Sequence, residues 1–284
     1  MLLGFHKCGT TDIEQWFHLH KQVVSSNADY FYDKNTSASC PFEWIERHQH
    51  QKRLLYNDPR LTSYDSCPGC IGIYWVKEES AFITLQSTVQ YLQYTLTAFS
   101  RYVITMRKPS SRMISHFFYT LQQGDHSASF NTIGGSLLHK IVSESLLSLT
   151  SCLKEYGTTV CVLVPGLSPI KNPYSYVTEM VTQSCYSTHL TEVLKFIPRE
   201  LIYFSRLEDY SKEEVKVMKE ILSFVGLSES GLRNVNQLKK SAKNAIKFPK
   251  PVLKETDQML DDFYRPFNKE LADLLSDDRW LWLY

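Results

Sequence analysis

The chain has 284 residues and a formal net charge of +1, from 31 Lys and Arg against 30 Asp and Glu. This balance argues against a broad nucleic-acid-binding surface and against an acidic tail. With 43% hydrophobic and 21% charged residues, the composition predicts a globular protein with a sizeable core. The sequence holds no run of about 18 apolar residues, so we expect no membrane span, and residues 1–9 are too short for a signal peptide.

Short apolar segments alternate with helical patterns along the chain, which predicts an α/β fold whose parallel sheet is covered by helices on both faces. Residues 2–5 form the first predicted strand, and residues 6–11 form a tight turn. A helix follows, in which apolar residues recur at near-helical spacing from Ile13 onwards.

The middle of the chain predicts a second strand and helix. Residues 102–106 have the pattern of a buried strand, which Pro109 stops. The helix expected at residues 110–123 has Ser110 or Ser111 available as its cap.

Two further strands are predicted, at residues 160–164 and at residues 201–204. The capping box Ser-Lys-Glu-Glu at residues 211–214 predicts the start of a helix that stops at Gly226. Pro266 is expected to kink or end the last helix.

No repeat, low-complexity tract or Pro/Gly/Ser-rich linker divides the chain, so we expect one domain over residues 1–284. Residues 33–72 lack a clear period and are expected to form a long irregular excursion, a kind of segment that often carries function.

Cys67 and Cys70 are spaced like half a zinc ribbon, but no second ligand pair follows, so no metal site is predicted. Asn35 begins a glycosylation sequon, which matters only in the secretory pathway.

Residues 4–11, Gly-Phe-His-Lys-Cys-Gly-Thr-Thr, have the features of an anion site. A turn at a helix N-terminus offers free backbone N–H groups and the positive end of the helix dipole. Gly9 permits close backbone approach, Lys7 adds a point charge, and the two threonines add hydroxyl donors. The pattern is not a Walker loop, because Lys7 precedes Gly9. The alternative is an ordinary strand-to-helix turn with a solvated lysine.

A second segment indicates the same kind of ligand. Arg107 stands at the carboxyl end of the second predicted strand, where open α/β sheets bind ligands, and Ser115 follows eight positions later. Both side chains can point at one phosphate. In the alternative interpretation, Arg107 pairs with a carboxylate and Ser115 is solvated.

Together these segments resemble the 5′-phosphosulfate and 3′-phosphate loops of sulfotransferases that use 3′-phosphoadenosine 5′-phosphosulfate (PAPS). The resemblance is closest to the Golgi carbohydrate group that includes N-acetylgalactosamine 4-sulfate 6-O-sulfotransferase. Residues 7–12 match that group's Lys-Cys-Gly-Thr-Thr-Asp at all six positions. The residues that match its second loop, Arg-Asp-Pro-x-x-Arg-x-x-Ser, are Arg107, Pro109, Arg112 and Ser115. Lys108 replaces the acidic residue of that pattern.

Further matches follow in the family's order. Arg206-Leu-Glu-Asp209 resembles the family's Arg-x-Glu-Asp strand end, and residues 262–268 and 277–282 resemble its closing helices. The match is weakest over residues 33–90. The resemblance implies a single-domain sulfotransferase fold of the P-loop-like kind.

The resemblance also implies that PAPS is the co-substrate and that no metal is needed. The implied donor-binding residues are Lys7, Cys8, Gly9, Thr10, Thr11, Asp12, Arg107, Ser115, Lys240 and Ser241. Lys7 is further implied to act in catalysis, more than in binding, by stabilising charge on the leaving phosphate oxygen during in-line transfer. For Lys240 and Ser241 a solvated basic loop is the alternative.

The catalytic base is implied to be a carboxylate that accepts the proton of the acceptor hydroxyl. Asp29 stands twenty-two positions after Lys7, where the family has its Glu, and precedes an aromatic cluster. Glu43 is the competing candidate if the alignment slips. A surface carboxylate is the alternative for both, and a group such as His6 is considered if neither serves.

Cys152 and Cys161 match the spacing of a Cys pair in related carbohydrate sulfotransferases, which implies a disulfide around Tyr156-Gly157. Two buried free thiols are the alternative. The resemblance further implies a location in the Golgi lumen, although this sequence lacks the anchor of the Golgi relatives.

The resemblance therefore implies an enzyme that transfers a sulfuryl group from PAPS to a hydroxyl of a glycosaminoglycan-like carbohydrate. Basic residues within 47–53 suit an anionic glycan, and a solvated charged helix face explains them equally well. One rival is a catalytically inactive nucleotide- or glycan-binding relative, because Asp29 stands in place of Glu. The other is a nucleotide-dependent kinase, which the position of Lys7 before Gly9 disfavours.

Overall fold

The computed structural model describes residues 2–25, 62–64, 66–68, 101–123, 135–163, 175–232 and 251–283. The strands are β1 (Leu2–Gly4), β2 (Val23–Ser25), β3 (Thr62–Tyr64), β4 (Ser66–Pro68), β5 (Tyr102–Met106) and β6 (Ile202–Arg206). The helices are α1 (Thr10–His18), α4 (Pro109–Gln123), α6 (Gly135–Leu163), α7 (Ser175–Thr182), α8 (Tyr186–Leu194), α9 (Leu207–Lys212), α10 (Glu214–Phe224) and α11 (Lys254–Leu275), with short 3-10 helices at Arg199–Leu201, Glu229–Gly231 and Asp278–Leu281.

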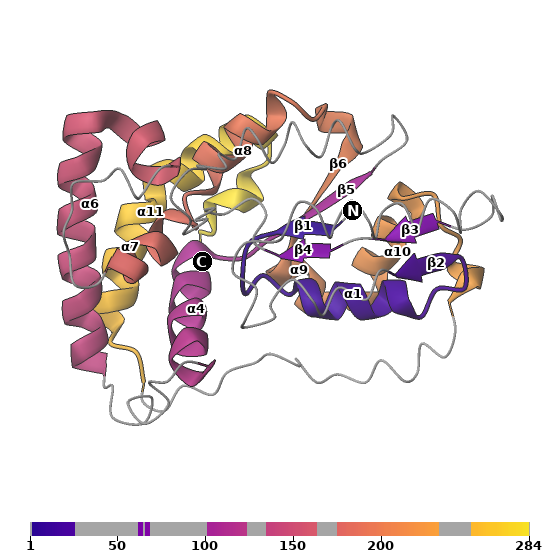
Figure 1. Ribbon diagram of the computed structural model, residues 1–284, viewed down its shortest axis with the longest axis horizontal. Helices are drawn as coiled ribbons and strands as arrows, with labels where there is room; N and C mark the ends of the chain where they lie inside the picture. Colours follow the sequence, from indigo (N-terminus) through magenta and orange to yellow (C-terminus); the bar gives the residue numbers. More distant parts are fainter. Residues whose placement is uncertain are drawn as a thin grey trace, which may run out of the picture.

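A four-stranded parallel sheet in the order β4-β1-β5-β6 lies at the centre of the fold (Figure 1). β1 pairs with β4 on one side and with β5 on the other, and β5 pairs along its whole length with β6. Every residue of β5 is buried, as expected for a strand covered on both faces. β2 and β3 form a separate parallel pair. The predicted α/β class is thus confirmed.

Helices cover both faces of the central sheet. On one face, Ile104 and Met106 of β5 pack with residues of α8, α11 and the C-terminal 3-10 helix. On the other face, Val103 packs with the apolar sides of α1 and α10. A third apolar cluster joins α4, α6, α7 and α11 beside the sheet, at the left of Figure 1.

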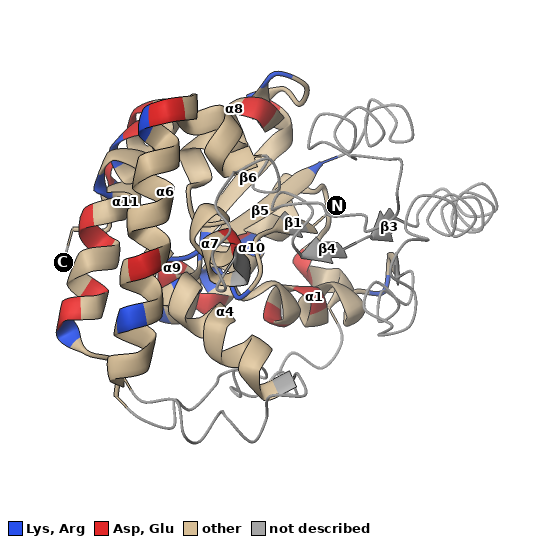
Figure 2. Ribbon diagram, turned by 60° about the vertical axis from the view of Figure 1, so that its left-hand side comes forward, with Lys and Arg blue, Asp and Glu red and all other residues tan. Residues whose placement is uncertain are grey.

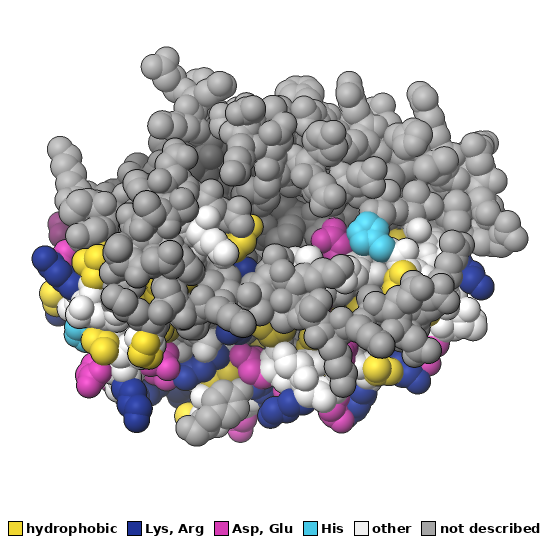
Figure 3. Space-filling view, turned by 90° about the horizontal axis from the view of Figure 1, so that it is seen from below, with side chains coloured by type: hydrophobic (Ala, Val, Ile, Leu, Met, Phe, Trp, Pro, Cys, Tyr) yellow, Lys and Arg dark blue, Asp and Glu magenta, His cyan; other side chains and the backbone are white. Residues whose placement is uncertain are grey.

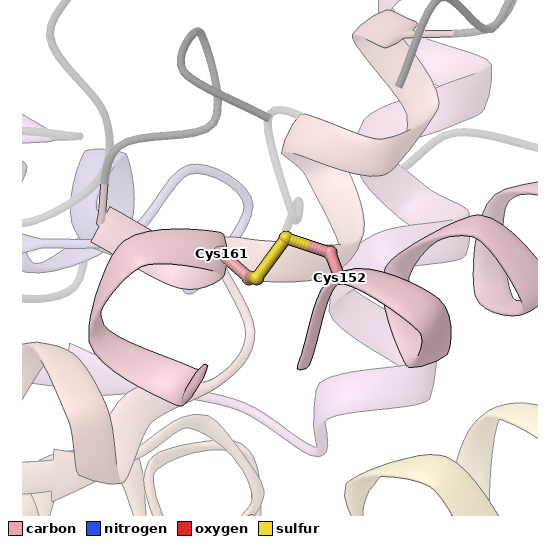
Figure 4. Close-up of a disulfide and its surroundings, with 2 residues drawn as sticks. All are labelled: Cys152 and Cys161. Atoms are coloured by element: carbon pink, nitrogen blue, oxygen red, sulfur yellow. A yellow bond between two sulfur atoms is a disulfide. The ribbon is translucent and has the colours of Figure 1, made fainter. Parts of the chain in front are cut away.

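Residues 160–163 are helical, so the prediction of a strand at residues 160–164 is wrong for this part. They end α6, whose backbone leaves helical geometry at Gly157 (φ 79°, ψ 170°). A short apolar run with β-branched residues fits a buried strand or a buried helix equally well, and the turn at Gly157 hides the helical period. Cys152 and Cys161 reach toward each other from the two helical arms and form the predicted disulfide, with Cα atoms 5.9 Å apart (Figure 4).

The start of α4 differs from the predicted cap. The helix begins at Pro109, and the carbonyl of Lys108 accepts the Arg112 N–H at 2.9 Å, so neither Ser110 nor Ser111 is the cap. A proline suits the first helical position, because the missing N–H has no intrahelical partner there.

The predicted capping box at residues 211–214 is wrong. Ser211 lies inside α9, and α10 begins at Glu214 with Glu213 in the N-cap position. No Gly or Pro separates α9 from α10, so the sequence does not show that one helix ends and another begins here. α10 ends before Gly226, as predicted, and Gly226 has a left-handed backbone (φ 78°).

Pro266 does not end the last helix, because α11 continues to Leu275. Buried residues lie on both sides of the proline, with Leu260 and Tyr264 before it and Phe267 after it. Packing of this apolar side outweighs the local cost of the proline.

Within residues 33–72, the structure describes only residues 62–64 and 66–68. These are β3 and β4, so for these six residues strand replaces the expected irregular chain. The rest of this range lies outside the described residues. Among the helices that are described, none is long and apolar enough to cross a membrane.

We expect the combined change Cys152→Ser and Cys161→Ser to lower the free energy of unfolding by about 2–3 kcal/mol, because the unfolded chain gains the entropy that this loop closure removes. Urea unfolding of the variant and of the oxidised wild type measures the difference. Reduction should bring the wild type to the stability of the variant and leave the variant unchanged. Equal stability of variant and oxidised wild type would contradict a stabilising disulfide.

Candidate active site

Loop 1 (residues 5–9) joins β1 to α1 at the carboxyl end of the central sheet. Lys7 (φ 68°) and Gly9 (φ 82°) both have a left-handed backbone. Gly9 is the N-cap residue of α1, and no side chain caps the helix there. The left-handed backbone of Gly9 favours glycine, and a Cβ there would also lie 2.5 Å from Cδ1 of Leu207 on α9. An N-terminus without a side-chain cap is the arrangement in which helices bind anions.

Loop 2 (Arg107 and Lys108) joins β5 to α4 and emerges beside loop 1. Gly4 at the end of β1 pairs with Thr105 of β5, so the two parallel strands end at the same edge of the sheet. A Cβ at Gly4 would lie 2.9 Å from Oγ1 of Thr105, which explains the glycine at this position. Ligands of open α/β sheets bind at this edge.

Tyr186 of α8 connects the two loops. Its hydroxyl donates to the carbonyl of Arg107 at 2.9 Å and lies 3.7 Å from Sγ of Cys8. Its ring packs on Phe5, with the ring centroids 4.6 Å apart. Burial raises the pKa of Cys8 to about 11, so the thiol stays protonated and its side chain serves packing.

Arg112 of α4 is fully buried and connects loop 1 to the junction of α7 and α8. Its Nη1 donates to the carbonyl of His6 and to Oε1 of Gln183, both at 3.3 Å. Its Nε donates to Oγ of Ser184, and its Nη2 donates to the carbonyl of Met180. These acceptors are all uncharged, so within the described part of the chain this buried cation has hydrogen bonds but no carboxylate partner.

His6 and His116 form a stacked pair beside Arg112, with ring centroids 5.1 Å apart. Nη1 of Arg112 lies 3.3 Å from Nδ1 of His116, and a guanidinium can only donate, so this Nδ1 carries no proton. Burial, followed by Arg112 and other nearby positive charges, lowers the pKa of His6 to about 4 and that of His116 to about 2. Such a low pKa makes His6 a poor general base near neutral pH.

Lys7 places its ammonium over the ring of Tyr119, with Nζ 4.1 Å from the ring centroid. Partial burial and, second, the Arg107 guanidinium lower the pKa of Lys7 to about 8. Lys7 and Arg107 are therefore close enough to repel each other. In the described ranges, the Arg107 guanidinium forms no ion pair, so these ranges do not support its pairing with a carboxylate. Two cations held together suit an anionic ligand.

Lys108, which replaces the acidic residue of the family pattern, anchors loop 2. Its Nζ lies 2.7 Å from Oδ2 of Asp261 on α11, and its backbone N–H donates to Oε1 of Glu208 at 2.7 Å. The other oxygen of Glu208 accepts from Nε1 of Trp282 at 3.2 Å. Basic and acidic residues therefore lie next to one another where α4 and α9 begin, as the blue and red segments in Figure 2 show.

The predicted donor-binding residues around loop 1 lie together but are unequally exposed. Cys8 and Thr10 are buried, whereas Thr11 and Asp12 are partly exposed. The pKa of Tyr210 on α9 is raised, first by burial and then by nearby carboxylates, one of which is Asp12. The charge of Asp12 therefore lies close to α9.

The remaining predicted site residues are less well defined. Ser115 is buried, with 5% of its surface exposed, about two turns along α4 from loop 2. Asp29, Glu43, Lys240 and Ser241 lie outside the described residues, so their roles stay predictions.

The sequence analysis missed the face of α4 that contacts loop 1. Arg112, His116 and Tyr119 repeat at intervals of four and three residues, and each contacts His6 or Lys7. This spacing was a readable signal, since Arg112 already belonged to the matched pattern. Tyr186 had no local signal, because its contacts join segments far apart in the sequence.

The described surface carries both signs of charge. On the side shown in Figure 3, Lys and Arg alternate with Asp and Glu over the described residues. No group of His, Cys, Asp or Glu suited to hold a metal ion occurs in the part of the chain that the structure describes.

We expect the free energy of unfolding to fall as the pH drops below about 6.5. His189 is buried, His6 and His116 are partly buried, and each has a folded-state pKa well below the ordinary 6.5. The unfolded chain therefore binds these protons first, and each histidine costs about 1.4 kcal/mol per pH unit until its own folded pKa is reached. Urea unfolding at pH 7, 6 and 5 measures the slope, in a range above most carboxylate titrations.

His116→Gln should reduce this slope of unfolding free energy against pH by about 1.4 kcal/mol per pH unit, the contribution of one proton, since glutamine does not titrate. A wild-type stability that is constant between pH 7 and 5 would contradict the neutral state of these histidines.

The chain is similar to known proteins both in sequence and in fold. A family profile described as "Sulfotransferase domain" matches residues 1–265. Human carbohydrate sulfotransferase 15 is 24% identical over 191 residues, which cover 64% of this chain and 31% of that protein. Carbohydrate sulfotransferase 15 of Nototodarus sloanii is 26% identical over 150 residues, which cover 51% of this chain and 91% of that protein.

A solved sulfotransferase from Alicyclobacillus acidocaldarius has a similar fold, with a TM-score of 0.54 at 13% identity. The alignment covers 98% of this chain and 97% of that structure. The matched segment is only about a third of the length of the human relative. Since the family profile matches most of the chain, and the fold agrees, the chain belongs to the sulfotransferase domain family.

Proposed function

We propose that this protein transfers a sulfuryl group from PAPS to a hydroxyl group of a carbohydrate. Membership of the sulfotransferase family and the names of the curated relatives support sulfuryl transfer to carbohydrate. The match covers 31% of the human relative, so the activity of the whole protein is part of the proposal.

The concentration of positive charge at one edge of the sheet supports this function most directly. Lys7 and Arg107 come from the two loops, and Arg112 holds loop 1 from α4. Like charges that are partly or fully buried together repel one another in the free protein. An anion with phosphate groups at two positions, such as the PAPS nucleotide, relieves this repulsion at both loops.

Each loop has a separate role in this proposal. Lys7 and the backbone N–H groups of loop 1 stabilise charge that develops on the leaving phosphate oxygen during in-line displacement. Arg107 and Ser115 bind the 3′-phosphate, together with Lys240 and Ser241. Thr11 adds a hydroxyl donor at the 5′ side, while Cys8, Gly9, Thr10 and Asp12 contribute through their backbone.

The acceptor and the location extend the same proposal. Asp29, or Glu43 in the alternative alignment, accepts the proton of the acceptor hydroxyl. We propose a glycosaminoglycan-like anionic glycan as the acceptor. An oxidising compartment such as the Golgi lumen suits the disulfide between Cys152 and Cys161.

Transfer of labelled sulfate from PAPS to a panel of sulfated and unsulfated glycans tests this function, with ATP hydrolysis measured in parallel. Transfer to a glycan supports the proposal. Binding of adenosine 3′,5′-bisphosphate without transfer would indicate an inactive relative, and ATP hydrolysis without transfer would indicate a kinase-like enzyme.

Arg107→Ala should weaken the binding of adenosine 3′,5′-bisphosphate by about 1.5–3 kcal/mol, or roughly tenfold to 150-fold, because a charge-assisted phosphate contact is lost. Isothermal titration calorimetry measures the change. Arg265→Ala is the matched control, because Arg265 is exposed and pairs with Asp262 on α11. Unchanged affinity in Arg107→Ala would remove Arg107 from the donor site.

Asp29→Asn should lower kcat by about 10²–10⁴ and leave donor affinity nearly intact, because it keeps the shape of the side chain and removes its basicity. Glu43→Gln, assayed in parallel, decides between the two alignments. Asp29→Glu restores the family residue and should retain or raise kcat.

Full turnover in Asp29→Asn, together with loss of turnover in Glu43→Gln, would transfer the role to Glu43. Full turnover in both variants would refute a carboxylate base at either position.

A further inference from the structure

His6 and Lys7 of loop 1 rest on one face of α4. Arg112 donates to the carbonyl of His6, and the His116 ring stacks on the His6 ring. One turn further along, the Tyr119 ring lies 4.1 Å from Nζ of Lys7. Consecutive residues of the loop therefore contact consecutive turns of the helix.

The backbone of Lys7 makes this contact specific. Lys7, with φ 68°, is held in the left-handed region that residues other than glycine rarely populate. The surrounding contacts must stabilise that conformation, and the hydrogen bond from Arg112 to the preceding carbonyl is one of them. With the backbone fixed in this way, the Lys7 side chain reaches the ring of Tyr119.

We propose that Tyr119 is a positioning residue for Lys7, whose ammonium it holds in the orientation used during sulfuryl transfer. This inference rests on the proposed function. The face of an aromatic ring attracts a cation through its quadrupole. Unlike a carboxylate, the ring has no net charge, so it orients the ammonium without repelling an anionic donor.

The chemistry of the ring face determines which substitutions matter. Tyr119→Leu removes the π face and should lower kcat about three- to thirtyfold, with a smaller effect on the Kd of adenosine 3′,5′-bisphosphate. Tyr119→Phe keeps the ring face and should restore most of kcat. If the hydroxyl acted directly on the substrate, Tyr119→Phe would be as impaired as Tyr119→Leu, and the inference would be wrong.

A double-mutant cycle separates positioning of Lys7 from a general structural role. In a Lys7→Met background, Tyr119→Leu should cost nothing further in kcat, because the group that it positions is gone. The same loss in both backgrounds would overturn the inference. Tyr156→Leu is the matched control, because Tyr156 is 44% exposed on α6, and it should leave kcat unchanged in both backgrounds.

A second measurement does not depend on activity. In protein labelled with ¹³C-lysine, the Lys7 side-chain resonance, identified by its loss in Lys7→Met, should show an upfield ring-current shift. Tyr119→Phe should keep this shift and Tyr119→Leu should abolish it. Transfer activity without a ring-current shift overturns the inference alone. A ring-current shift without any transfer overturns the proposed function, and with it the catalytic use of the contact.

Discussion

The arrangement of the site depends on the hydrogen bonds of the buried Arg112 guanidinium. They join α4 to the His6 carbonyl in loop 1 and to Met180 and Gln183 near the junction of α7 and α8. A lysine could not replace this residue, because its single ammonium cannot span acceptors that lie in different directions around a planar fork. Loss of the guanidinium would remove the hydrogen bond that it gives to each of these acceptors.

The neutral character of these acceptors has an electrostatic consequence. A carboxylate beside Arg112 would cancel its charge, whereas carbonyl, amide and hydroxyl groups fix its position and leave the charge effective. The lowered pKa values of His6 and His116 reflect this charge, after burial itself. Neutral imidazoles and the cationic Lys7, Arg107 and Arg112 therefore lie close together where loop 1, loop 2 and α4 meet. An anion is the ligand that this field attracts most strongly.

Local sequence patterns predicted three of the four strands described in the central sheet and missed β4. β1, β5 and β6 are short apolar runs, each followed by a turn or a helix start, and their order along the chain implied parallel pairing. The same kind of pattern failed at residues 160–163, where a tight turn and a disulfide place an apolar run in a helix. Helix starts were also mispredicted, because Ser110 and Ser211 are common cap residues that here lie inside helices.

The two loops of the site were predictable, because each joins a strand to a helix at the edge of a parallel sheet. The contacts that hold the loops were not predictable, because they come from distant segments. Tyr186 and Glu208 reach the loops from elements more than seventy residues away, so no local pattern records these bonds. Sequence spacing on α4 contained part of the answer, since Arg112, His116 and Tyr119 share one helical face.

In both loops, a cation is followed directly by an anchored residue. Lys7 precedes Cys8, which is buried against Tyr186, and Arg107 precedes Lys108, which pairs with Asp261. Anchoring the second residue restricts the backbone of the first, so the backbone that carries each cation is held in place before any ligand arrives. Groups that stabilise developing charge are most effective when they do not reorganise during the reaction. Lys108 stands where the family pattern has an acidic residue, and it can still anchor the loop. It does so as the positive partner of an ion pair with Asp261 on α11.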